Sequence, residues 1–361
     1  MKATQELHDL GQSLWLDNIT RDLLDNGELK RYIDELSVTG LTSNPTIFEH
    51  AISKSKSYDA EISRMVSNAL SGEELFFELA LQDLTRAADL FASVHDRTAG
   101  NDGFVSLEVS PLLAYDADGS LAAAATLHKK ANRSNLFIKI PGTKEGNVAI
   151  EKATAAGIAI NVTLLFSREH YLESASAYMR GLERRIDAGL SPDIRSVASV
   201  FVSRWDGATI EKVPERLRDK LGIAIGKQIY KAYRDILDSE RWQRLANFGA
   251  RPQRLLFAST GTKDPKASDV LYIGGLAAPN TINTMPEKTL MAFGDHGQLA
   301  GTLPRDGGDC EAVLKDFRST GIDLEQLAAD LQANGAKSFD ESWQNLLSAI
   351  EAKGKQLKLA S

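Results

Sequence analysis

The stretch that decides the fold is Leu136-Phe137-Ile138-Lys139-Ile140, which is followed by a helical stretch at 146–155 and a second apolar run at 158–163. The two outer runs have the length and composition of strands, and the segment between them has helical periodicity. Parallel strands are joined by a crossover of a dozen or more residues, usually a helix. The stretch therefore predicts a strand-helix-strand unit of a parallel sheet.

The same alternation extends along the chain. Strands are predicted near 13–17, 38–43, 104–109, 136–140, 158–163, 197–202, 254–259 and 271–274, with helices that include 73–94, 121–130, 167–186 and 214–237. Eight such units are typical of a TIM barrel, which needs about 250 residues. We expect an α/β fold: a single (β/α)8 barrel domain over residues 1–361, with extra helices and a helical C-terminal extension at 309–361. The sequence has no linker rich in Pro, Gly and Ser that would separate two domains, which favours a single domain.

Composition narrows the class of protein. The chain has 361 residues, 43% hydrophobic, and its 42 Lys and Arg against 49 Asp and Glu give a net charge of -7. This balance argues against a nucleic-acid-binding surface. No stretch approaches the roughly 20 apolar residues of a membrane span, and the first residues lack a signal peptide's apolar region. The single Cys310 excludes an intramolecular disulfide. We expect a soluble, cytoplasmic protein.

Alternation within each predicted strand separates two faces, because successive side chains of a strand point to opposite sides. In 136–140 the aliphatic side chains share one face, and Phe137 and Lys139 share the other. If the aliphatic faces contact the helices, the polar residues point into the barrel near the carboxyl ends of the strands, where barrel enzymes carry their active sites. The polar residues selected in this way are Asp17, Ser106, Glu108, Asn161, Thr163 and Ser199.

Each of these polar residues has a structural alternative. Ser106, Thr163 and Ser199 could cap helices or bind loops. Lys139 and Glu108 are harder to explain in this way, since ionised side chains are costly to bury unless they are paired or neutralised. A built functional site is therefore favoured, with a structural ion pair as the alternative.

A lysine on an apolar strand suits nucleophilic catalysis. The neutral amine attacks a ketone to form an iminium ion, and desolvation disfavours the ammonium form. The iminium is an electron sink, so the carbon–carbon bond beyond the adjacent alcohol can break. A carboxylate has to take the proton of that alcohol and later return one. Asp17 and Glu108 are the candidates, acting directly or through a water held by Thr163.

Two further groups of residues could bind substrate. The side-chain amides of Asn44 and Asn161 can hydrogen-bond hydroxyls of a three-carbon fragment without titrating. Ser199 and Arg204 follow the sixth predicted strand, and the guanidinium of arginine suits a phosphate. Lys263 follows the seventh predicted strand, and barrel phosphates are often bound near strands seven and eight.

In chain order, these motifs resemble the transaldolase family of Schiff-base aldolases. The matching stretches are Trp15-Leu16-Asp17-Asn18, Thr42-Ser43-Asn44-Pro45-Thr46, Val105-Ser106-Leu107-Glu108-Val109, Ile138-Lys139-Ile140-Pro141-Gly142-Thr143, 161–167 and 199–204. The Pro-Gly-Thr continuation and Asp295-His296-Gly297 are similar to the longer bacterial branch. The resemblance implies a (β/α)8 barrel.

The resemblance also implies roles for these residues. Lys139 corresponds to the Schiff-base lysine and Asp17 to the acid/base. The positions of Glu108 and Thr163 hold a catalytic water in the family. The substrate-binding positions are Asn44 and Asn161 for dihydroxyacetone, Ser199 and Arg204 for phosphate, and Phe201 beside the Schiff base. A second phosphate-binding arginine of other branches is missing here, and Lys263 is our candidate to replace it.

The implied reaction belongs to the pentose phosphate pathway. A dihydroxyacetone unit passes from sedoheptulose 7-phosphate to glyceraldehyde 3-phosphate, which gives erythrose 4-phosphate and fructose 6-phosphate. No cofactor or metal is expected, and no partner beyond sugar phosphates, with a monomer or homodimer as the assembly. The alternatives are another Schiff-base aldolase that releases free dihydroxyacetone and a non-catalytic barrel that binds sugar phosphates.

Several weaker motifs remain. The six histidines lack HxxH or HExxH spacing, which argues against a metal site. Asp116-Ala117-Asp118-Gly119 lacks the closing glutamate of a calcium loop and predicts a turn followed by a helix. His296 is interpreted as a loop residue, with a substrate contact as the alternative. Gly274-Gly275 either lets backbone approach a phosphate or permits a tight turn.

Overall fold

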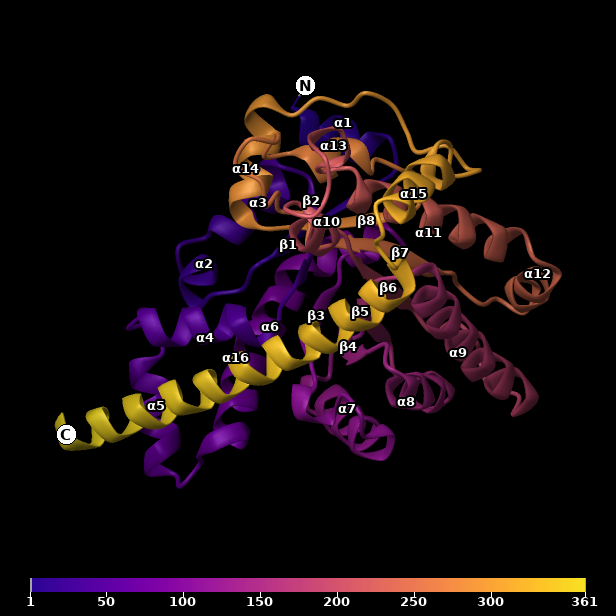
Figure 1. Cartoon of the computed structure of the whole chain (residues 1–361). Coiled ribbons are helices and arrows are strands. Elements are labelled where there is room, and N and C mark those ends of the chain that lie inside the picture. The colour runs from indigo at the N-terminus through magenta and orange to yellow at the C-terminus, as the bar shows by residue number, and fades with distance from the viewer. Residues whose placement is uncertain (1, 361) are drawn as a thin grey trace.

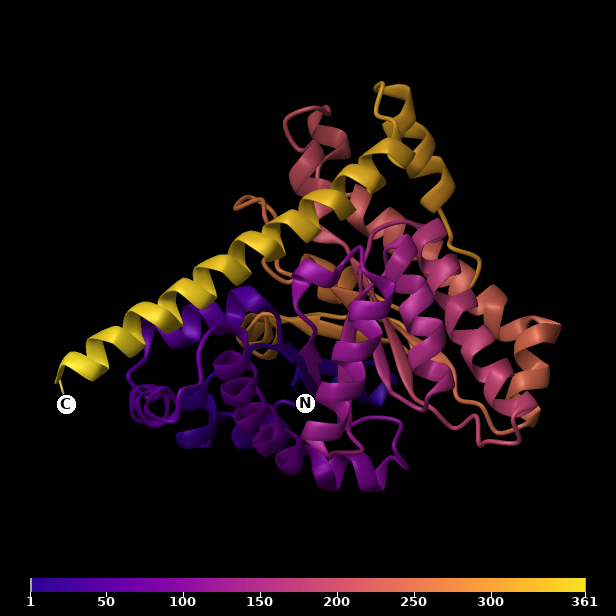
Figure 2. The same ribbon diagram turned by 90° about the horizontal axis from the view of Figure 1, so that it is seen from below.

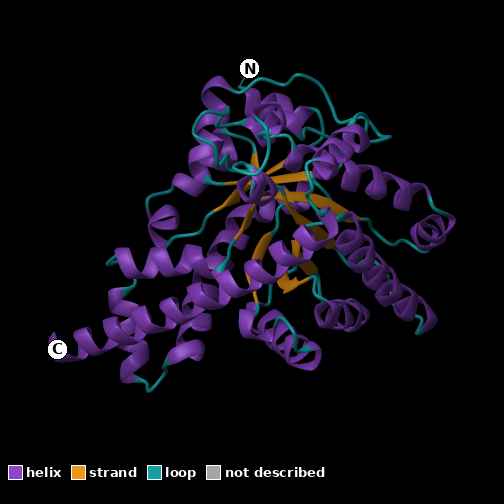
Figure 3. Cartoon of the chain, viewed as in Figure 1, coloured by secondary structure: helices purple, strands orange, loops and turns teal. Residues whose placement is uncertain are grey.

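The computed structural model describes residues 2–360, and eight parallel strands within them form a closed barrel in chain order (Figures 1 and 3). The last strand pairs with the first, which closes the ring. In Figure 3 the helices surround the strands. The structure is therefore a (β/α)8 barrel, as predicted. The strands are β1 (Ser13–Asp17), β2 (Val38–Thr42), β3 (Val105–Glu108), β4 (Leu136–Pro141), β5 (Ile160–Leu165), β6 (Ser196–Phe201), β7 (Gln253–Ala258) and β8 (Ile282–Met285).

Helices separate the strands of the barrel, and further helices precede β1 and follow β8. The helices that precede β5 are α1 (Ala3–Asp9), α2 (Arg21–Asp25), α3 (Glu28–Glu35), α4 (Pro45–Lys54), α5 (Asp59–Ser67), α6 (Gly72–Arg97), η1 (Pro111–Leu113), α7 (Ala117–Ala131) and α8 (Lys144–Ala155). Those that follow β5 are α9 (Arg168–Asp187), α10 (Ser203–Thr209), η2 (Glu215–Leu217), α11 (Leu221–Asp238), α12 (Glu240–Asn247), α13 (Leu271–Gly275), α14 (Glu287–His296), α15 (Cys310–Ser319) and α16 (Leu324–Ala360).

The strand predicted at 271–274 is wrong. Those residues form the short helix α13, and the eighth strand lies later, at Ile282–Met285. Short apolar runs fit a buried helix as well as a buried strand. The true strand has Asn283 and Thr284 at its centre, both buried, which breaks the apolar pattern. Gly274 and Gly275 lie inside α13 and not after a strand, so neither reading of this pair applies.

The other strand predictions agree with the structure to within about two residues, and the expected alternation of faces holds inside the barrel. Trp15 of β1 and Phe137 of β4 have ring centroids 6.2 Å apart, although their strands are not neighbours. Each is two residues before a candidate catalytic residue on the same face, Asp17 or Lys139. Gly40 makes room for the indole, because a Cβ there would lie 2.5 Å from Trp15. Aromatic rings thus fill the barrel beneath the polar candidates.

The long helix α16 crosses the carboxyl end of the barrel (Figures 1 and 2). It packs against η1, the end of β5, and the helices α4, α5 and α6. Most of its buried residues recur every three or four positions, which is the pattern of a helix with one buried face: Leu324, Ala328, Leu331, Gly335, Phe339, Trp343, Leu346, Ile350 and Gly354, with Ala336 beside Gly335. The C-terminal extension is therefore helical, as predicted, and it covers part of the barrel opening.

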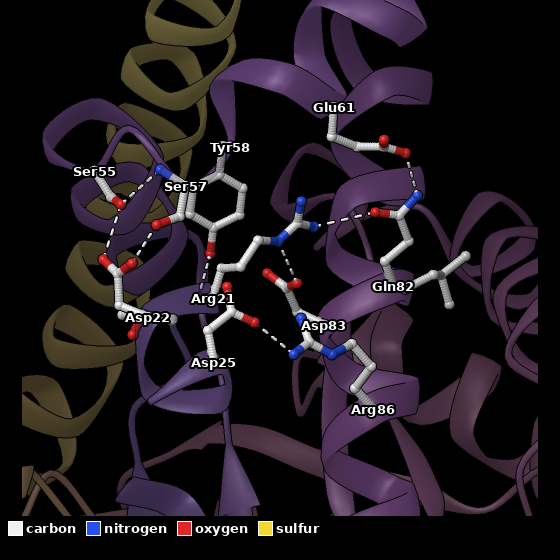
Figure 4. A network of polar contacts seen from close by, with 12 residues as sticks. Arg21, Asp22, Asp25, Ser55, Ser57, Tyr58, Glu61, Gln82, Asp83 and Arg86 are labelled. Atoms are coloured by element: carbon white, nitrogen blue, oxygen red, sulfur yellow. Dashed lines mark hydrogen bonds and ion pairs between the residues drawn. The ribbon is translucent and has the colours of Figure 1, made fainter. Parts of the chain in front are cut away.

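A polar network joins the first turn of α2 to α6 (Figure 4). Arg21 Nε lies 2.9 Å from Asp83 Oδ1, and both side chains are buried. The guanidinium also lies over the ring of Tyr58, 4.7 Å from its centroid, and donates to Gln82 Oε1 at 3.1 Å. Because Arg21 follows β1 closely, this network fixes the start of the loop region after Asp17.

Within residues 2–360, no helix combines the length and the apolar character that crossing a bilayer requires.

Candidate active site

A cavity of about 270 Å³ lies at the carboxyl end of the barrel. Residues of every strand except β3 line it, together with residues of the following loops and of α16. The lining consists of Asp17, Thr42, Asn44, Thr46, Ile47, His50, Lys139, Thr163, Ser199, Phe201, Arg204, Ala258, Ser259, Gly261, Lys263, Thr284, Pro286 and Phe339. The position agrees with the general location of active sites in barrel enzymes.

The structure brings the ten residues selected from the sequence to one place. Eight of them line the cavity: Asp17, Asn44, Lys139, Thr163, Ser199, Phe201, Arg204 and Lys263. Glu108 and Asn161 lie just behind the wall, and each makes a hydrogen bond with a lining residue.

Lys139 and Glu108 form a buried ion pair. Lys139 Nζ lies 3.0 Å from Glu108 Oε2, and the two residues are 5% and 4% exposed. They are direct partners in the register of β3 and β4, so the sheet itself holds them together. The ammonium also donates to the carbonyl oxygen of Ser43 at 2.8 Å.

Burial determines the electrostatics of Glu108. Desolvation raises the pKa of this carboxyl, while the charge of Lys139 opposes the increase and that of Asp17 adds to it. Its second oxygen, Oε1, and the hydroxyl of Thr163 are buried and have no hydrogen-bond partner among residues 2–360. Buried polar atoms normally have a partner, which is often an ordered water. Each atom is therefore available to hydrogen-bond an ordered water or another small polar molecule.

Asp17 is held by hydroxyl groups. Thr42 Oγ1 donates to Asp17 Oδ1 at 2.7 Å, and Thr42 Oγ1 is also 2.7 Å from Thr284 Oγ1 of β8. Burial raises the pKa of Asp17, and the charges of Lys139 and Lys263 oppose this increase. A carboxylate with a raised pKa exchanges protons closer to neutral pH, which suits general acid/base work.

The two asparagines differ in their contacts. Asn44 is the N-cap of α4, and its Oδ1 accepts from the backbone N–H of Ile47 at 3.0 Å. Asn44 also lines the cavity. Asn161 is completely buried and lies in a chain of hydrogen bonds, because it donates to Ser106 Oγ at 3.0 Å and accepts from Ser199 Oγ at 2.7 Å. Asn161 and Ser199 are thus already oriented by each other.

Two cations lie on one side of the cavity. Desolvation lowers the pKa of Arg204, and no carboxylate among the described residues forms an ion pair with it. Lys263 stands at the more exposed rim, where partial desolvation and the charge of Arg204 lower its pKa. Two neighbouring cations, of which Arg204 has no carboxylate partner among the described residues, favour an anion such as phosphate.

Sequence reasoning missed several lining residues. Thr284 was missed because the eighth strand was placed too early, and Phe339 because nothing in a helical tail indicates a contact with the barrel opening. Thr46 ends the recognised motif at 42–46 but was not selected as a site residue, and His50 lies one helical turn later on α4. A buried position at helical spacing was the only available signal for Phe339.

The weaker motifs fall outside the cavity. His296 is the last residue of α14 and not a loop residue as predicted; it is exposed, lies 2.9 Å from Asp269, and does not line the cavity. Asp116 is the N-cap of α7 and accepts from the N–H of Gly119 at 2.9 Å, as the predicted turn and helix start require.

Comparison with known proteins identifies the family. The model of the family described as Transaldolase/Fructose-6-phosphate aldolase matches residues 14–350. The chain belongs to the transaldolase/fructose-6-phosphate aldolase family. The resemblance found in the ordered motifs is thereby confirmed, and the match spans the whole barrel and most of α16.

Individual members of the transaldolase/fructose-6-phosphate aldolase family are similar to this chain over nearly its full length. A transaldolase of Arthrobacter sp. (strain FB24) is 43% identical over 357 residues, which cover 96% of each chain. A transaldolase of Thiobacillus denitrificans is 42% identical, with 97% of this chain and 100% of the relative covered. Transaldolase 2 of Nostoc punctiforme is 38% identical, with 98% and 97% covered.

Proposed function

We propose that this protein is a transaldolase that transfers a dihydroxyacetone unit between sugar phosphates. The donor and acceptor are sedoheptulose 7-phosphate and glyceraldehyde 3-phosphate, and the products are erythrose 4-phosphate and fructose 6-phosphate. The observation that carries the proposal is the Lys139–Glu108 pair, buried at the carboxyl end of the barrel beside a cavity that also contains Asp17. The names of the relatives support the same assignment.

The first half of the reaction uses Lys139 as the nucleophile. A proton passed from Lys139 to Glu108, 3.0 Å away, leaves a neutral amine, and the raised pKa of Glu108 favours this transfer. The amine attacks the ketone, water leaves, and an iminium forms. Asp17 then takes the proton of the alcohol on the far carbon of the bond that breaks. The bonding electrons move into the iminium, an enamine remains on Lys139, and the first aldehyde departs.

The second half reverses these steps with another aldehyde. The enamine carbon attacks the acceptor carbonyl, and Asp17 returns its proton to the new alkoxide. Water then hydrolyses the iminium and releases Lys139. We assign the handling of this water to Glu108 Oε1 and Thr163 Oγ1, since both are buried near Lys139 and have no partner among the described residues.

We assign the remaining residues to substrate binding. The side-chain amide of Asn44 and the Asn161–Ser199 pair bind hydroxyls of the dihydroxyacetone part. The resemblance implied a phosphate role for Ser199, but its 2.7 Å hydrogen bond to Asn161 supports the role beside dihydroxyacetone instead. Arg204 and Lys263 bind the phosphate at the other end of the cavity. Phe201 lines the cavity, and we assign it as an apolar wall beside the Schiff base.

Release of free dihydroxyacetone is the main alternative activity. The family name includes an aldolase, but the relatives at about 40% identity are named transaldolase. A binding protein without activity has no need of a buried lysine flanked by two carboxylates. Transfer is therefore the function that we propose.

A coupled assay with fructose 6-phosphate and erythrose 4-phosphate tests the proposal. We expect formation of glyceraldehyde 3-phosphate that depends on both substrates. Equal amounts of free dihydroxyacetone and glyceraldehyde 3-phosphate without an acceptor would instead identify an aldolase. Sugar-phosphate binding without product in either assay would identify a non-catalytic barrel.

We further propose that the chain forms one domain, is cytoplasmic, and acts as a monomer or homodimer. One continuous core runs from Ala3 to Ile350, which supports a single domain. Phosphorylated sugars are substrates of the cell interior, which supports the location. A single cooperative unfolding transition would support one domain. Cell fractionation tests the location, and light scattering tests the oligomeric state.

A further inference from the structure

The guanidinium of Arg204 lies between two aromatic rings from distant parts of the chain. Its Cζ is 5.2 Å from the ring centroid of Phe201, on β6, and 6.0 Å from that of Phe339, on α16. Both rings are buried, at 8% and 5% exposure. These distances fall within the range of cation–π contacts. The side chain thus contacts two aromatic rings in place of a carboxylate partner. We call Phe201 and Phe339 together the aromatic seat of Arg204.

A glycine completes this seat. Gly335 precedes Phe339 by four residues, so the two share one face of α16. A Cβ at Gly335 would lie 3.2 Å from Arg204 Nη1 and 3.0 Å from Leu164 Cδ2, which is closer than ordinary contact. Glycine inside a helix is unfavourable relative to alanine. Its presence here is explained by the space that the guanidinium occupies.

Other contacts prevent α16 from shifting along the barrel. Gln332 Nε2 donates to the carbonyl oxygens of Gly142 at 3.1 Å and Leu164 at 3.0 Å, at the ends of β4 and β5. Ser342 Oγ is 2.7 Å from Thr46 Oγ1 on α4. These anchors lie on either side of Gly335 and Phe339. The part of α16 that contacts Arg204 is therefore fixed to α4 and to the carboxyl ends of the strands that carry Lys139 and Thr163.

We propose that Phe339 and Gly335 are positioning residues that hold Arg204 toward the phosphate of the substrate. The inference rests on the proposed function for the identity of that anion. An arginine side chain loses considerable rotamer freedom when it is ordered. A seat that orders it before the anion arrives removes this cost from binding. A carboxylate partner would order it too, but it would compete with the phosphate. Two rings and a glycine fix the cation and leave its charge available.

Phe339→Leu tests the seat, with Phe339→Tyr as the conservative variant. The acceptors compared are glyceraldehyde 3-phosphate and glyceraldehyde, which differ only in the phosphate. For Phe339→Leu we expect KM for the phosphorylated acceptor to rise about 3- to 30-fold, as loss of one cation–π contact implies, with kcat changed far less. The unphosphorylated acceptor should be affected little, and Phe339→Tyr should restore the wild-type values. Gly335→Ala should act in the same direction as Phe339→Leu.

Leu346→Ala is the matched control, because Leu346 is buried on α16 and does not line the cavity. It should lower the thermal midpoint and leave the preference for the phosphorylated acceptor unchanged. If Leu346→Ala changes that preference as much as Phe339→Leu does, α16 acts only through general stability and the proposal is overturned. An unchanged preference in folded, active Phe339→Leu also overturns it.

Calorimetric titration with inorganic phosphate separates this inference from the proposed function, since it requires no turnover. Wild-type protein should bind phosphate more tightly than Phe339→Leu, whereas Leu346→Ala should bind like wild type. An inactive wild-type protein with this pattern would refute the transaldolase assignment and retain the seat. An active wild-type protein whose phosphate affinity is the same in Phe339→Leu would retain the assignment and refute the seat.

Discussion

Glu108 and Lys139 are direct neighbours in the register of β3 and β4, and their charged groups are 3.0 Å apart and buried. The pair is therefore set by the backbone of the sheet and not by a flexible loop. A carboxyl whose pKa is raised by burial can hold a proton that the amine gives up. Removing either partner leaves the other group buried alone, which is costly.

Lys139→Ala should abolish covalent capture of substrate. Borohydride reduction in the presence of fructose 6-phosphate should add the mass of a reduced dihydroxyacetone unit to wild-type protein and nothing to the variant. Intact-mass spectrometry followed by peptide mapping measures this. An adduct of equal size in the variant would assign the Schiff base to another lysine.

Asp17→Asn should still form a Schiff base, but borohydride should trap mainly the uncleaved fructose 6-phosphate adduct. Turnover should fall by about 100- to 10,000-fold, the usual contribution of a general acid/base. Burial raises the pKa of Asp17, and its ionised form is the base for cleavage. In wild-type protein kcat should therefore fall as the pH drops through this raised pKa. The variant should lack that acid limb in its pH profile, and normal turnover would exclude Asp17 as the acid/base.

Lys263→Ala should raise KM for phosphorylated substrates about 3- to 10-fold, because the lysine is partly exposed and its contribution is screened. The charge of Lys263 also lowers the pKa of Asp17. The acid limb of the pH profile should therefore move to higher pH in this variant. Lys266→Ala is the control, since Lys266 is exposed on the same loop and does not line the cavity. An acid limb that moves equally in both variants would contradict the assignment.

Asp206 should make stability depend on pH. It accepts hydrogen bonds from Tyr272 Oη, Leu221 N and Gly222 N, yet burial raises its pKa to about 6 from 3.8. Because the folded protein binds the proton of Asp206 more tightly than the unfolded chain does, this group increases the free energy of unfolding. The contribution is fully present below pH 3.8 and is lost as the pH rises through about 6. The difference amounts to about 3 kcal/mol.

Asp206→Asn removes this titration. The destabilisation that it causes, relative to wild type, should be larger at pH 4 than at pH 7. Urea unfolding at both values measures the two free energies. A penalty independent of pH would show that Asp206 does not titrate in this range.

Arg21→Met should destabilise the protein by about 3 to 5 kcal/mol, because Asp83 would remain buried without its partner (Figure 4). Arg86→Met removes an ion pair with Asp25 whose side chains are about half exposed, and it should cost no more than about 1 kcal/mol. Urea unfolding compares the two variants. Equal effects would mean that burial of the Arg21 pair has no energetic consequence.

Much of the site could be predicted from the strands alone. A strand points every second side chain to the same face, so the positions of Asp17, Lys139, Thr163 and Ser199 followed from parity once the strands were located. The Lys139–Glu108 partnership followed because both strands end at the same level. These features depend on local backbone geometry, which short sequence patterns specify well.

The remaining features depend on tertiary packing. The apolar run at 271–274 satisfies a strand pattern, but it forms a helix, and the polar interior of Ile282–Met285 concealed the true strand. Phe339 reaches the cavity only because α16 crosses the barrel, and no periodicity within the helix specifies that direction. The spacing of its buried residues indicated one covered face but not what covers it.

The position of α16 also sets an order of events during synthesis. β8 ends at Met285, so every strand needed to close the ring has been translated before Gln332, Gly335 and Phe339 are added to the growing chain. A nascent chain can therefore pair β1 with β8 while the guanidinium of Arg204 still lacks one of its two rings. The two-ring environment of Arg204 is therefore complete only after the whole barrel, Lys139 included, has been translated.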